Sequence, residues 1–151
     1  QKLPLWHKQG YIDNMSKREN IVKRFYEVAK AQRSVKFNTV VRDPINAEEL
    51  PRTGFPAAYL ESSNEERINI TKTLRECNMD IAIVITVNGR DRDTQRNVAI
   101  EAIEESIYND TEINSLVNSI ELTNIDIVDL GEASPFATVR VTFGVTYCYT
   151  V

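Results

Sequence analysis

The final stretch of the chain, residues 136–151, is the longest run in which apolar and polar side chains alternate strictly. This period of two predicts a β-strand with one face in a core and the other outside it. The apolar side consists of Ala137, Val139, Val141, Phe143, Val145, Tyr147, Tyr149 and Val151. Fully extended at about 3.3 Å per residue, the run spans roughly 50 Å, whereas the usual strand has about five or six residues. We therefore expect its end either to bend or to project toward a neighbouring subunit, and Phe143 to lie in the core between sheet and helix.

The length and charge of the chain limit the classes of protein to which it can belong. A chain of 151 residues fits one domain of ordinary size. Its 18 basic and 22 acidic residues give a net charge of -4, which argues against binding nucleic-acid phosphates through bulk charge. Two cysteines are too few for a secreted disulfide scaffold, and no stretch has the length and apolarity of a membrane span. We expect a cytosolic protein that does not bind membranes.

The first residues differ in character from the rest of the chain. Residues 1–14 contain no uninterrupted apolar core ending in small residues, so they do not form a secretory signal. Met15 and the residues after it are typical of a natural start. We expect residues 1–14 to be a loosely held arm or an expression remnant, and residues 15–151 to form a single α+β domain.

The first half of the chain predicts one helix followed by strands. Ser16 and Glu19 form a capping box, after which a helix places its apolar stripe toward the core. That stripe consists of Ile21, Val22, Phe25, Val28 and Ala29. The strands expected next are residues 35–42, residues 55–60 with Pro56 at the start, and residues 68–74 as an exposed arm, separated by a polar loop at 43–54 and a hydrophilic turn at 62–66.

The second half begins with residues 77–87, which are apolar on nearly both sides and therefore belong in the middle of a sheet. Asp93 is expected to cap a helix, and Asp110 a shorter one. Their apolar faces consist of Val98, Ala102, Ile103 and Ile107 in the first helix, and of Ile113, Leu116 and Val117 in the second. A strand at 120–130 and a linker at 131–135 lead into the final strand.

This order of elements predicts the fold class. Neighbouring strands can pair through short turns, whereas only helical crossovers require parallel pairing. The sequence therefore predicts an α+β fold, in which a mostly antiparallel or mixed β-sheet carries the N-terminal helix and two further helices.

No residue pattern indicates catalysis. The single histidine, His7, lies in the doubtful N-terminal segment, so no base is available beside a nucleophile. The sequence contains no CxxC, HExxH, glycine-rich phosphate loop or calcium-binding spacing. Cys77 and Cys148 lack further soft ligands, and isolated cysteines of this kind are usually small packed side chains. We expect no catalytic residue, no metal site, no cofactor and no enzymatic activity.

The candidate contact residues lie in two charged loops. They combine polar backbone with both signs of charge beside rigid elements, which is typical of recognition loops. The candidates are Asp43, Asn46, Glu48 and Glu49 in the first loop and Arg90, Asp91, Arg92 and Asp93 in the second. We expect both loops to contact neighbouring subunits or a partner protein. For the second loop, a purely solvated turn and a catalytic charge cluster are the alternatives.

The order and spacing of several elements resemble one known family. The relevant pieces are the N-terminal helix, residues 55–60 leading into a polar Ser-Asn-Glu-Glu turn, the strand at 79–87, an amphipathic helix ending near Tyr108, and the closing Val-Thr-Phe-Gly-Val-Thr-Tyr strand. Together they resemble the tail terminator proteins of long-tailed bacteriophages, of the lambda gpU-like family. The likeness runs from about Met15 to the C-terminus. The longer N-terminus and residues 111–130 depart from the shorter members.

The resemblance implies a structural role in a virion. Members of this family form a hexameric ring that caps the tail tube, stops its polymerisation and provides the attachment surface for the head. The implied partners are further copies of the chain, the tail tube protein and the head-completion protein, with DNA passing through the pore without specific binding. The implied location is the neck end of the virion tail, after assembly in the host cytoplasm. A head-completion or connector neck protein and a small-molecule-sensing oligomeric α+β domain remain as alternatives.

Overall fold

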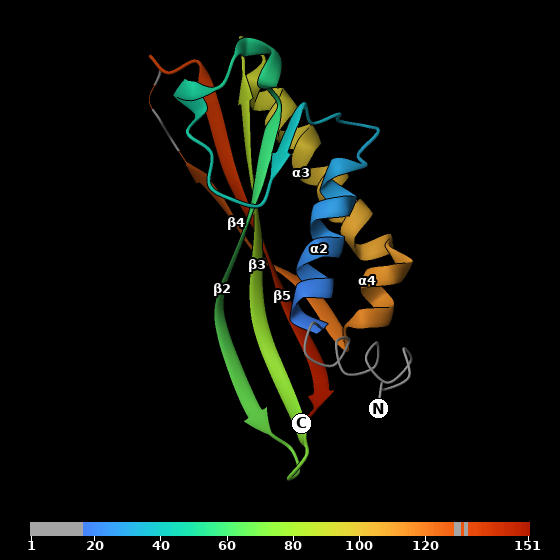
Figure 1. The fold of residues 1–151 in the computed structure, drawn as a ribbon. Coiled ribbons are helices and arrows are strands. Elements are labelled where there is room, and N and C mark those ends of the chain that lie inside the picture. The colour runs from blue at the N-terminus through green and yellow to red at the C-terminus, as the bar shows by residue number, and fades with distance from the viewer. Residues whose placement is uncertain (1–16, 129–130, 132) are drawn as a thin grey trace, which may run out of the picture.

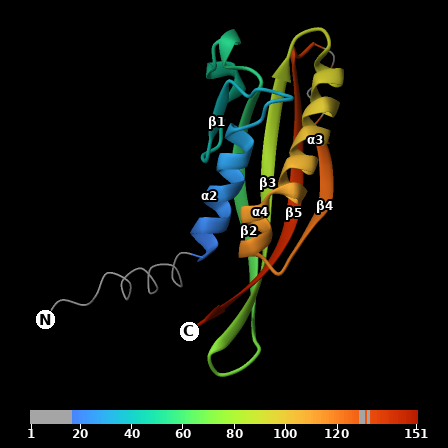
Figure 2. The ribbon, with the colours of Figure 1, turned by 90° about the vertical axis from the view of Figure 1, so that its right-hand side faces the viewer.

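The computed structural model describes residues 17–128, residue 131 and residues 133–151. These residues form two layers, a five-stranded sheet and a layer of helices on one of its faces (Figures 1 and 2). The elements in chain order are α2 (Lys17–Lys30), β1 (Thr39–Val41), the 3-10 turns η1 (Ala47–Glu49) and η2 (Arg52–Gly54), β2 (Ala57–Asn69), β3 (Leu74–Asn88), α3 (Arg92–Asn109), α4 (Thr111–Leu116), β4 (Ser119–Val128) and β5 (Phe136–Thr150). The α+β prediction is confirmed.

The sheet has the strand order β1-β2-β3-β5-β4. Only the pairing of β1 with β2 is parallel, so the sheet is mixed and mostly antiparallel. The predicted central strand is confirmed as β3, in which Ala82 and Val84 are buried on one face and the isoleucines on the other. β5 pairs with β3 along its whole length, from Asn88 opposite Phe136 to Leu74 opposite Thr150.

The core lies between the sheet and the helices. The alternation predicted for β5 is confirmed, since Ala137, Val139, Val141, Phe143, Val145 and Tyr147 are all buried. Phe143 is fully buried and meets two aromatic rings edge-on, Phe25 of α2 at 5.7 Å and Tyr108 of α3 at 6.1 Å. Such edge-to-face contacts are the preferred geometry of packed aromatic rings. This residue therefore joins the sheet to two helices.

The long strands extend past the helical layer. In Figure 1 the lower ends of β2, β3 and β5 continue below α2 and α4. The last strand therefore projects beyond α2 and α4, and its contact with a neighbouring subunit stays a prediction. The extension is a three-stranded arm, because the two flanking strands remain paired with β3 to its end.

The predicted turn at 62–66 and the separate strand at 68–74 are wrong. β2 runs without a break from Ala57 to Asn69, with a register shift between Ser63 and Glu65, and the chain reverses only after it. The error arose because polar residues in succession indicate a turn locally. Here long-range pairing with β3 supplies the backbone hydrogen bonds, and a strand with an exposed face tolerates polar side chains.

The observed ends of several other helices and strands also differ from the predicted ones. The strand expected at 35–42 is reduced to β1, a three-residue edge strand. α3 begins at Arg92, so Asp91 and not Asp93 occupies the N-cap position. Val98 is 43% exposed and Ala99 is buried in its place, because the buried stripe of α3 runs through Ala99, Ala102, Ile103 and Ile107 at helical spacing. Val117 follows α4 as its C-cap.

Three predictions involve residues outside the described part of the chain. Ser16 of the capping box and the arm at 1–14 lie there, as does the end of the strand expected at 120–130. Glu19, the other member of the capping box, uses its carboxylate to accept two hydrogen bonds from Arg42, at 2.7 and 2.8 Å. This ion pair holds the pKa of Glu19 below its ordinary value.

Candidate functional site

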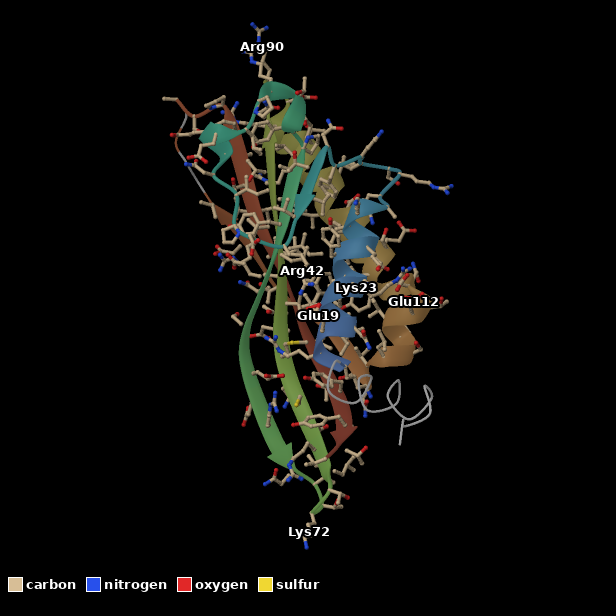
Figure 3. The ribbon with its side chains drawn as sticks, viewed as in Figure 1. Glu19, Lys23, Arg42, Lys72, Arg90 and Glu112 are labelled. Atoms are coloured by element: carbon tan, nitrogen blue, oxygen red, sulfur yellow. The ribbon has the colours of Figure 1, made fainter. Side chains whose placement is uncertain are left out.

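The two predicted contact loops lie at the same end of the molecule. Asn46 and Glu48 of the first loop line a groove of about 570 Å³ with Ser134, Pro135 and Phe136. The second loop joins the same segment, since the Gly89 amide donates to the Pro135 carbonyl at 3.2 Å. Figure 3 places Arg90 at the outermost point of this end. The segment before β5 therefore connects the two loops into one surface, which we call the loop end.

The first loop has an ordered backbone and exposed charges. The Asn46 side chain accepts a hydrogen bond from the Glu48 amide at 3.1 Å and so caps η1. The Asp43, Glu48 and Glu49 side chains are exposed, and among the described residues no cationic group lies within 4.0 Å of their carboxylates. These three negative charges are available to a partner.

Most charged side chains of the second loop already form hydrogen bonds or ion pairs within the chain. Gly89 has a φ of 112°, a conformation that glycine adopts without strain, and its carbonyl accepts from Arg92 at 3.2 Å. Asp91 accepts from Gln95 at 2.6 Å, and Asp93 lies 3.5 Å from Arg96. These contacts are the local ones expected at a helix start.

Arg90 is the exception in this loop. It is exposed, and among the described residues it has neither a hydrogen-bond partner nor an ion-pair partner. Of the second group of candidates, Arg90 is therefore the side chain most available for an external contact.

Sequence reasoning missed the contribution of residues 133–136. Residues 133–135 belong to the segment 131–135 that was interpreted as a linker because it contains a glycine and a proline, whereas Phe136 was assigned to the final strand. The available signal was Phe136, which begins the alternating run and whose ring lies 5.2 Å from that of Phe55. That contact anchors the linker beside the first loop.

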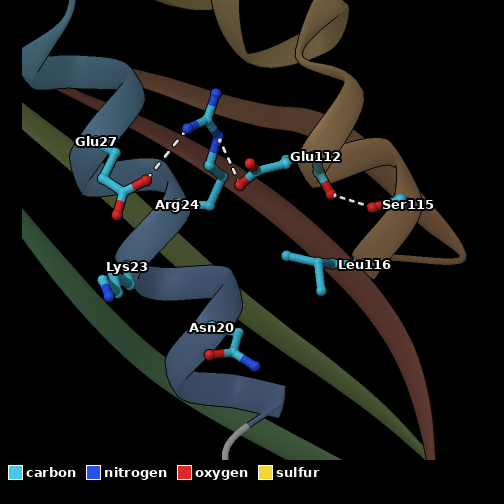
Figure 4. Close-up of a pocket in the computed structure, with 7 residues that line it drawn as sticks. All are labelled: Asn20, Lys23, Arg24, Glu27, Glu112, Ser115 and Leu116. Atoms are coloured by element: carbon cyan, nitrogen blue, oxygen red, sulfur yellow. Dashed lines mark hydrogen bonds and ion pairs between the residues drawn. The ribbon is translucent and has the colours of Figure 1, made fainter. Parts of the chain in front are cut away.

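A second groove lies between α2 and α4 and has a structural role. Figure 4 shows Arg24 of α2 pointing between Glu27 and Glu112 in this groove, which has a volume of about 290 Å³. Arg24 also forms a two-point contact with Asp110, at 2.9 and 2.7 Å, and Asp110 in turn caps α4 through the Ile113 amide. The Arg24 hydrogen bonds hold the pKa of Asp110 below its ordinary value of 3.8.

A third feature is the polar network at the base of the arm. The Tyr147 hydroxyl donates to Glu65 at 2.8 Å, and Glu65 also binds Arg67 at 3.2 Å and Arg18 at 3.4 Å. Burial and the neighbouring Glu65 carboxylate raise the pKa of Tyr147 above its ordinary value. The phenol is the donor in this hydrogen bond, which joins β5 to β2 across β3.

The side chains of the described residues do not gather into a chemical site. No group of three or more metal-ligating side chains occurs among them. Cys77 and Cys148 are both free, and they lie opposite Tyr147 and Glu76 in the register, so they do not pair with each other. No helix in the described part of the chain is both long and apolar enough to cross a membrane.

Two sheet edges lack a strand partner in the described part of the chain. β1 covers β2 only at Ala57, Ala58 and Tyr59, and β4 is the last strand on the other side. Such edges present rows of unpaired N–H and C=O groups to which another strand can add. On β4, Ile125 and Ile127 lie opposite the buried Val141 and Val139, so both belong to the helical side of the sheet, yet they are 39% and 52% exposed.

Comparison with known proteins gives only distant similarities. No family model and no curated protein matches the chain. A chain of the solved structure described as the virion of a native gene transfer agent particle is 12% identical, with a TM-score of 0.44, over 83% of this chain and 90% of that chain. The type 4 fimbrial biogenesis protein PilO from Pseudomonas aeruginosa is 8% identical, with a TM-score of 0.33, over 99% of this chain and 91% of that chain. Similarity at this level indicates neither a shared family nor a shared activity.

Proposed function

We propose that this chain is a structural protein of a phage-like virion and has no enzymatic activity. In this proposal six copies form a ring that caps the tail tube, stops its polymerisation and offers an attachment surface to the head. Its partners are further copies of itself, the tail tube protein and the head-completion protein at the neck end of the tail. The specific role follows from the resemblance in the order of sequence elements described above.

The observation that carries the proposal is the pair of unpaired sheet edges on opposite sides of one domain. The outer edge of β2 beyond Tyr59 and the outer edge of β4 differ in sequence and position. When two different surfaces of identical copies meet head to tail, the contact is heterologous, and it closes into a ring when the rotation between copies permits. Native proteins protect such edges in several ways, and pairing or covering by another molecule is one of them. The domain therefore has the features of a ring subunit.

The charge of the chain agrees with a pore through which DNA passes. A net charge of -4 does not attract phosphate, so DNA can move through an opening lined by such subunits without sticking. The loop end adds the exposed carboxylates of Asp43, Glu48 and Glu49. In this proposal the loop end faces a neighbouring subunit or the tube, where Arg90 supplies the opposite charge.

Light scattering after size exclusion, followed by electron microscopy with and without tail tubes of the same phage, tests the function. We expect a closed ring with an axial opening, present alone or formed on tube ends, and tubes of fixed length when the protein is included. A strictly monomeric protein that leaves tube growth unchanged would overturn the proposal. Binding to the portal side of the neck and not to tube ends would favour the head-completion alternative.

A further inference from the structure

We propose that residues 67–75, the hairpin tip, dock onto the outer face of α3 and the adjoining β4 edge of a neighbouring copy. This inference rests on the proposed function only in that both require copies of the chain to assemble. It names the two surfaces that meet, and neither lies at the loop end.

The hairpin tip is a positively charged, apolar projection. Residues 67–75 contain Arg67, Lys72 and Arg75 and no acidic residue. Two large apolar side chains in this segment are exposed, Ile68 at 42% and Ile70 at 51%. Lys72 marks the far end of the molecule in Figure 3. Among the described residues neither Lys72 nor Arg75 has a carboxylate within 4.0 Å, so these charges are not neutralised within the chain.

The tip is ordered despite its exposure. The Thr71 hydroxyl accepts hydrogen bonds from the Thr73 and Leu74 amides at 3.3 and 3.0 Å, and Arg75 donates to the carbonyls of Thr71 and Lys72 at 3.1 Å each. The Val151 amide donates to the Thr73 carbonyl at 2.7 Å, which ties the end of the chain to the turn. A pre-ordered surface loses less conformational entropy when it binds a partner.

The outer face of α3 has the complementary charge. Residues 97–109 contain Glu101, Glu104 and Glu105 and no basic residue. Among the described residues no cation lies within 4.0 Å of any of these three carboxylates. Like charges three or four residues apart on a helix repel each other and destabilise it slightly. A cationic partner would remove this repulsion.

The neighbouring β4 strand adds apolar surface to this acidic face. Ile125 and Ile127 lie on the helical side of β4, and Figure 2 shows α3 beside that strand. The Tyr108 hydroxyl of α3 accepts a hydrogen bond from the Leu122 amide of β4, so helix and strand are in direct contact. Acidic α3 and apolar β4 together form one surface, the α3–β4 surface.

The tip and the α3–β4 surface have opposite charges and both expose apolar side chains, and they lie too far apart to meet within one chain. In Figure 1 the tip lies at the bottom of the molecule and α3 in its upper half. Their contact therefore joins different copies, and when it repeats head to tail it is heterologous, as a ring requires. Opposite charges at such a contact fix the register and raise the association rate, while the isoleucines contribute buried apolar area.

Disulfide cross-linking tests the contact directly. In a Cys148→Ser background, protein carrying Ile70→Cys is mixed with protein carrying Ile127→Cys, and the matched control pairs Ile70→Cys with Val41→Cys at the opposite sheet edge. Val41 is a partly exposed apolar residue like Ile127, which makes it a suitable control. We expect at least about fivefold more cross-linked product with Ile127→Cys under mild oxidation. Equal yields in the two mixtures would overturn the inference.

Charge reversal gives an independent readout. Arg67→Glu with Lys72→Glu, or Glu101→Lys with Glu105→Lys, should each raise the concentration needed for half-assembly about tenfold in low salt, because each leaves like charges facing each other. Combining the two pairs should restore assembly to within about threefold of wild type. The control pair Arg33→Glu with Lys36→Glu makes the same change of charge at exposed residues elsewhere. If this control weakens assembly equally, or if the combined variant is not restored, the inference is wrong.

The outcomes separate this contact from the proposed function. A wild-type protein that assembles but shows no preferred Ile70 to Ile127 cross-link overturns the docking alone. A specific cross-link in a protein that does not cap tubes supports the docking and overturns the capping role. A protein that remains monomeric with and without tubes overturns both.

Discussion

At the residue scale, Phe143 is the side chain on which sheet and helices meet. It is fully buried, and its ring contacts Phe25 of α2 and Tyr108 of α3. The three residues lie far apart in sequence, so their contact depends on the packing of three separate elements. Removing the ring would leave Phe25 and Tyr108 without this contact.

We expect Phe143→Ala to lower the free energy of unfolding by about 3 to 5 kcal/mol, the range seen when a large buried side chain is deleted. Chemical denaturation followed by circular dichroism measures the loss. Thr142→Ala, on the opposite face of the same strand, serves as the control and should cost about 1 kcal/mol or less. A midpoint unaffected by Phe143→Ala would mean that the ring does not lie in the core.

The contact between Arg24 and Asp110 is a second feature at the residue scale. Asp110 is largely buried, accepts two hydrogen bonds from Arg24, and caps α4. Its pKa is lowered from 3.8 by those hydrogen bonds. Because the folded pKa lies below the unfolded one, the ionised form stabilises the fold above about pH 4, and this contribution disappears as pH falls through the folded value.

We expect Asp110→Asn to cost about 1 to 2 kcal/mol at pH 7, since asparagine keeps the cap but loses the charge. The difference from wild type should shrink as the pH falls through the lowered folded pKa of Asp110, because the protonated aspartate no longer carries the charge. Urea denaturation at several pH values checks both statements. Glu112→Gln, whose carboxylate is exposed and 3.3 Å from Arg24, should cost less than about 0.5 kcal/mol. A constant difference between pH 7 and pH 2 would exclude an ionic origin.

At the element scale, the loop between β3 and α3 has charges that the fold does not require. Arg90 has no partner among the described residues, and Arg92 donates only to the Gly89 carbonyl. Arg92 is also the first residue of α3, where a negative charge interacts favourably with the helix dipole. Helix stability therefore does not explain why position 92 carries an arginine.

We expect Arg90→Glu combined with Arg92→Glu to change the free energy of unfolding by no more than about 0.5 kcal/mol. The same variant should weaken ring formation or tube capping, and more strongly in low salt than in high salt, because screening removes the repulsion. Thermal unfolding and light scattering at two salt concentrations measure the two effects. Normal assembly and capping in low salt would show that this loop is only a solvated turn, and the contact would then belong to the first loop or the sheet.

At the scale of the whole molecule, the chain divides into a packed part and an arm. The buried core cluster ends at Cys77 of β3 and Tyr147 of β5, which face each other in the register. Beyond them, within the described part of the chain, the strands extend past α2 and α4, and Ile68, Ile70 and Val151 are exposed. Stability comes from the packed part, whereas the arm offers surface to another molecule.

We expect replacement of residues 68–76 by Asn-Gly to preserve the fold and abolish assembly. Arg67 and Cys77 are opposite each other in the sheet, so a two-residue turn can join them. Cooperative unfolding should remain, with a loss of no more than about 2 kcal/mol from the missing strand pairs. Circular dichroism and light scattering provide the measurements. A shortened protein that still forms the same oligomer would show that the arm is not part of the interface.

Much of this fold could be predicted from the sequence because its strongest signals are local. The alternation of β5, the two apolar faces of β3 and the stripe of α2 each depend on neighbouring residues along one element, so they identified the correct core side chains, Phe143 and Phe25 among them. The charged loops were recognised for the same reason. The side chains of Arg90 and Glu48 are charged, and charged side chains are expected at the protein surface.

The tertiary structure decided what depends on residues distant in the chain. Pairing with β3 made β2 one strand through Ser63 and Glu65, although the local sequence indicates a turn. Contacts of Pro135 and Phe136 brought the two loops to one end. The arm and the uncovered edges likewise result from unequal lengths of strands and helices. Hydrophobic periodicity determines which face of an element is buried, but backbone pairing between distant segments determines register, neighbours and edges, and no local pattern encodes that pairing.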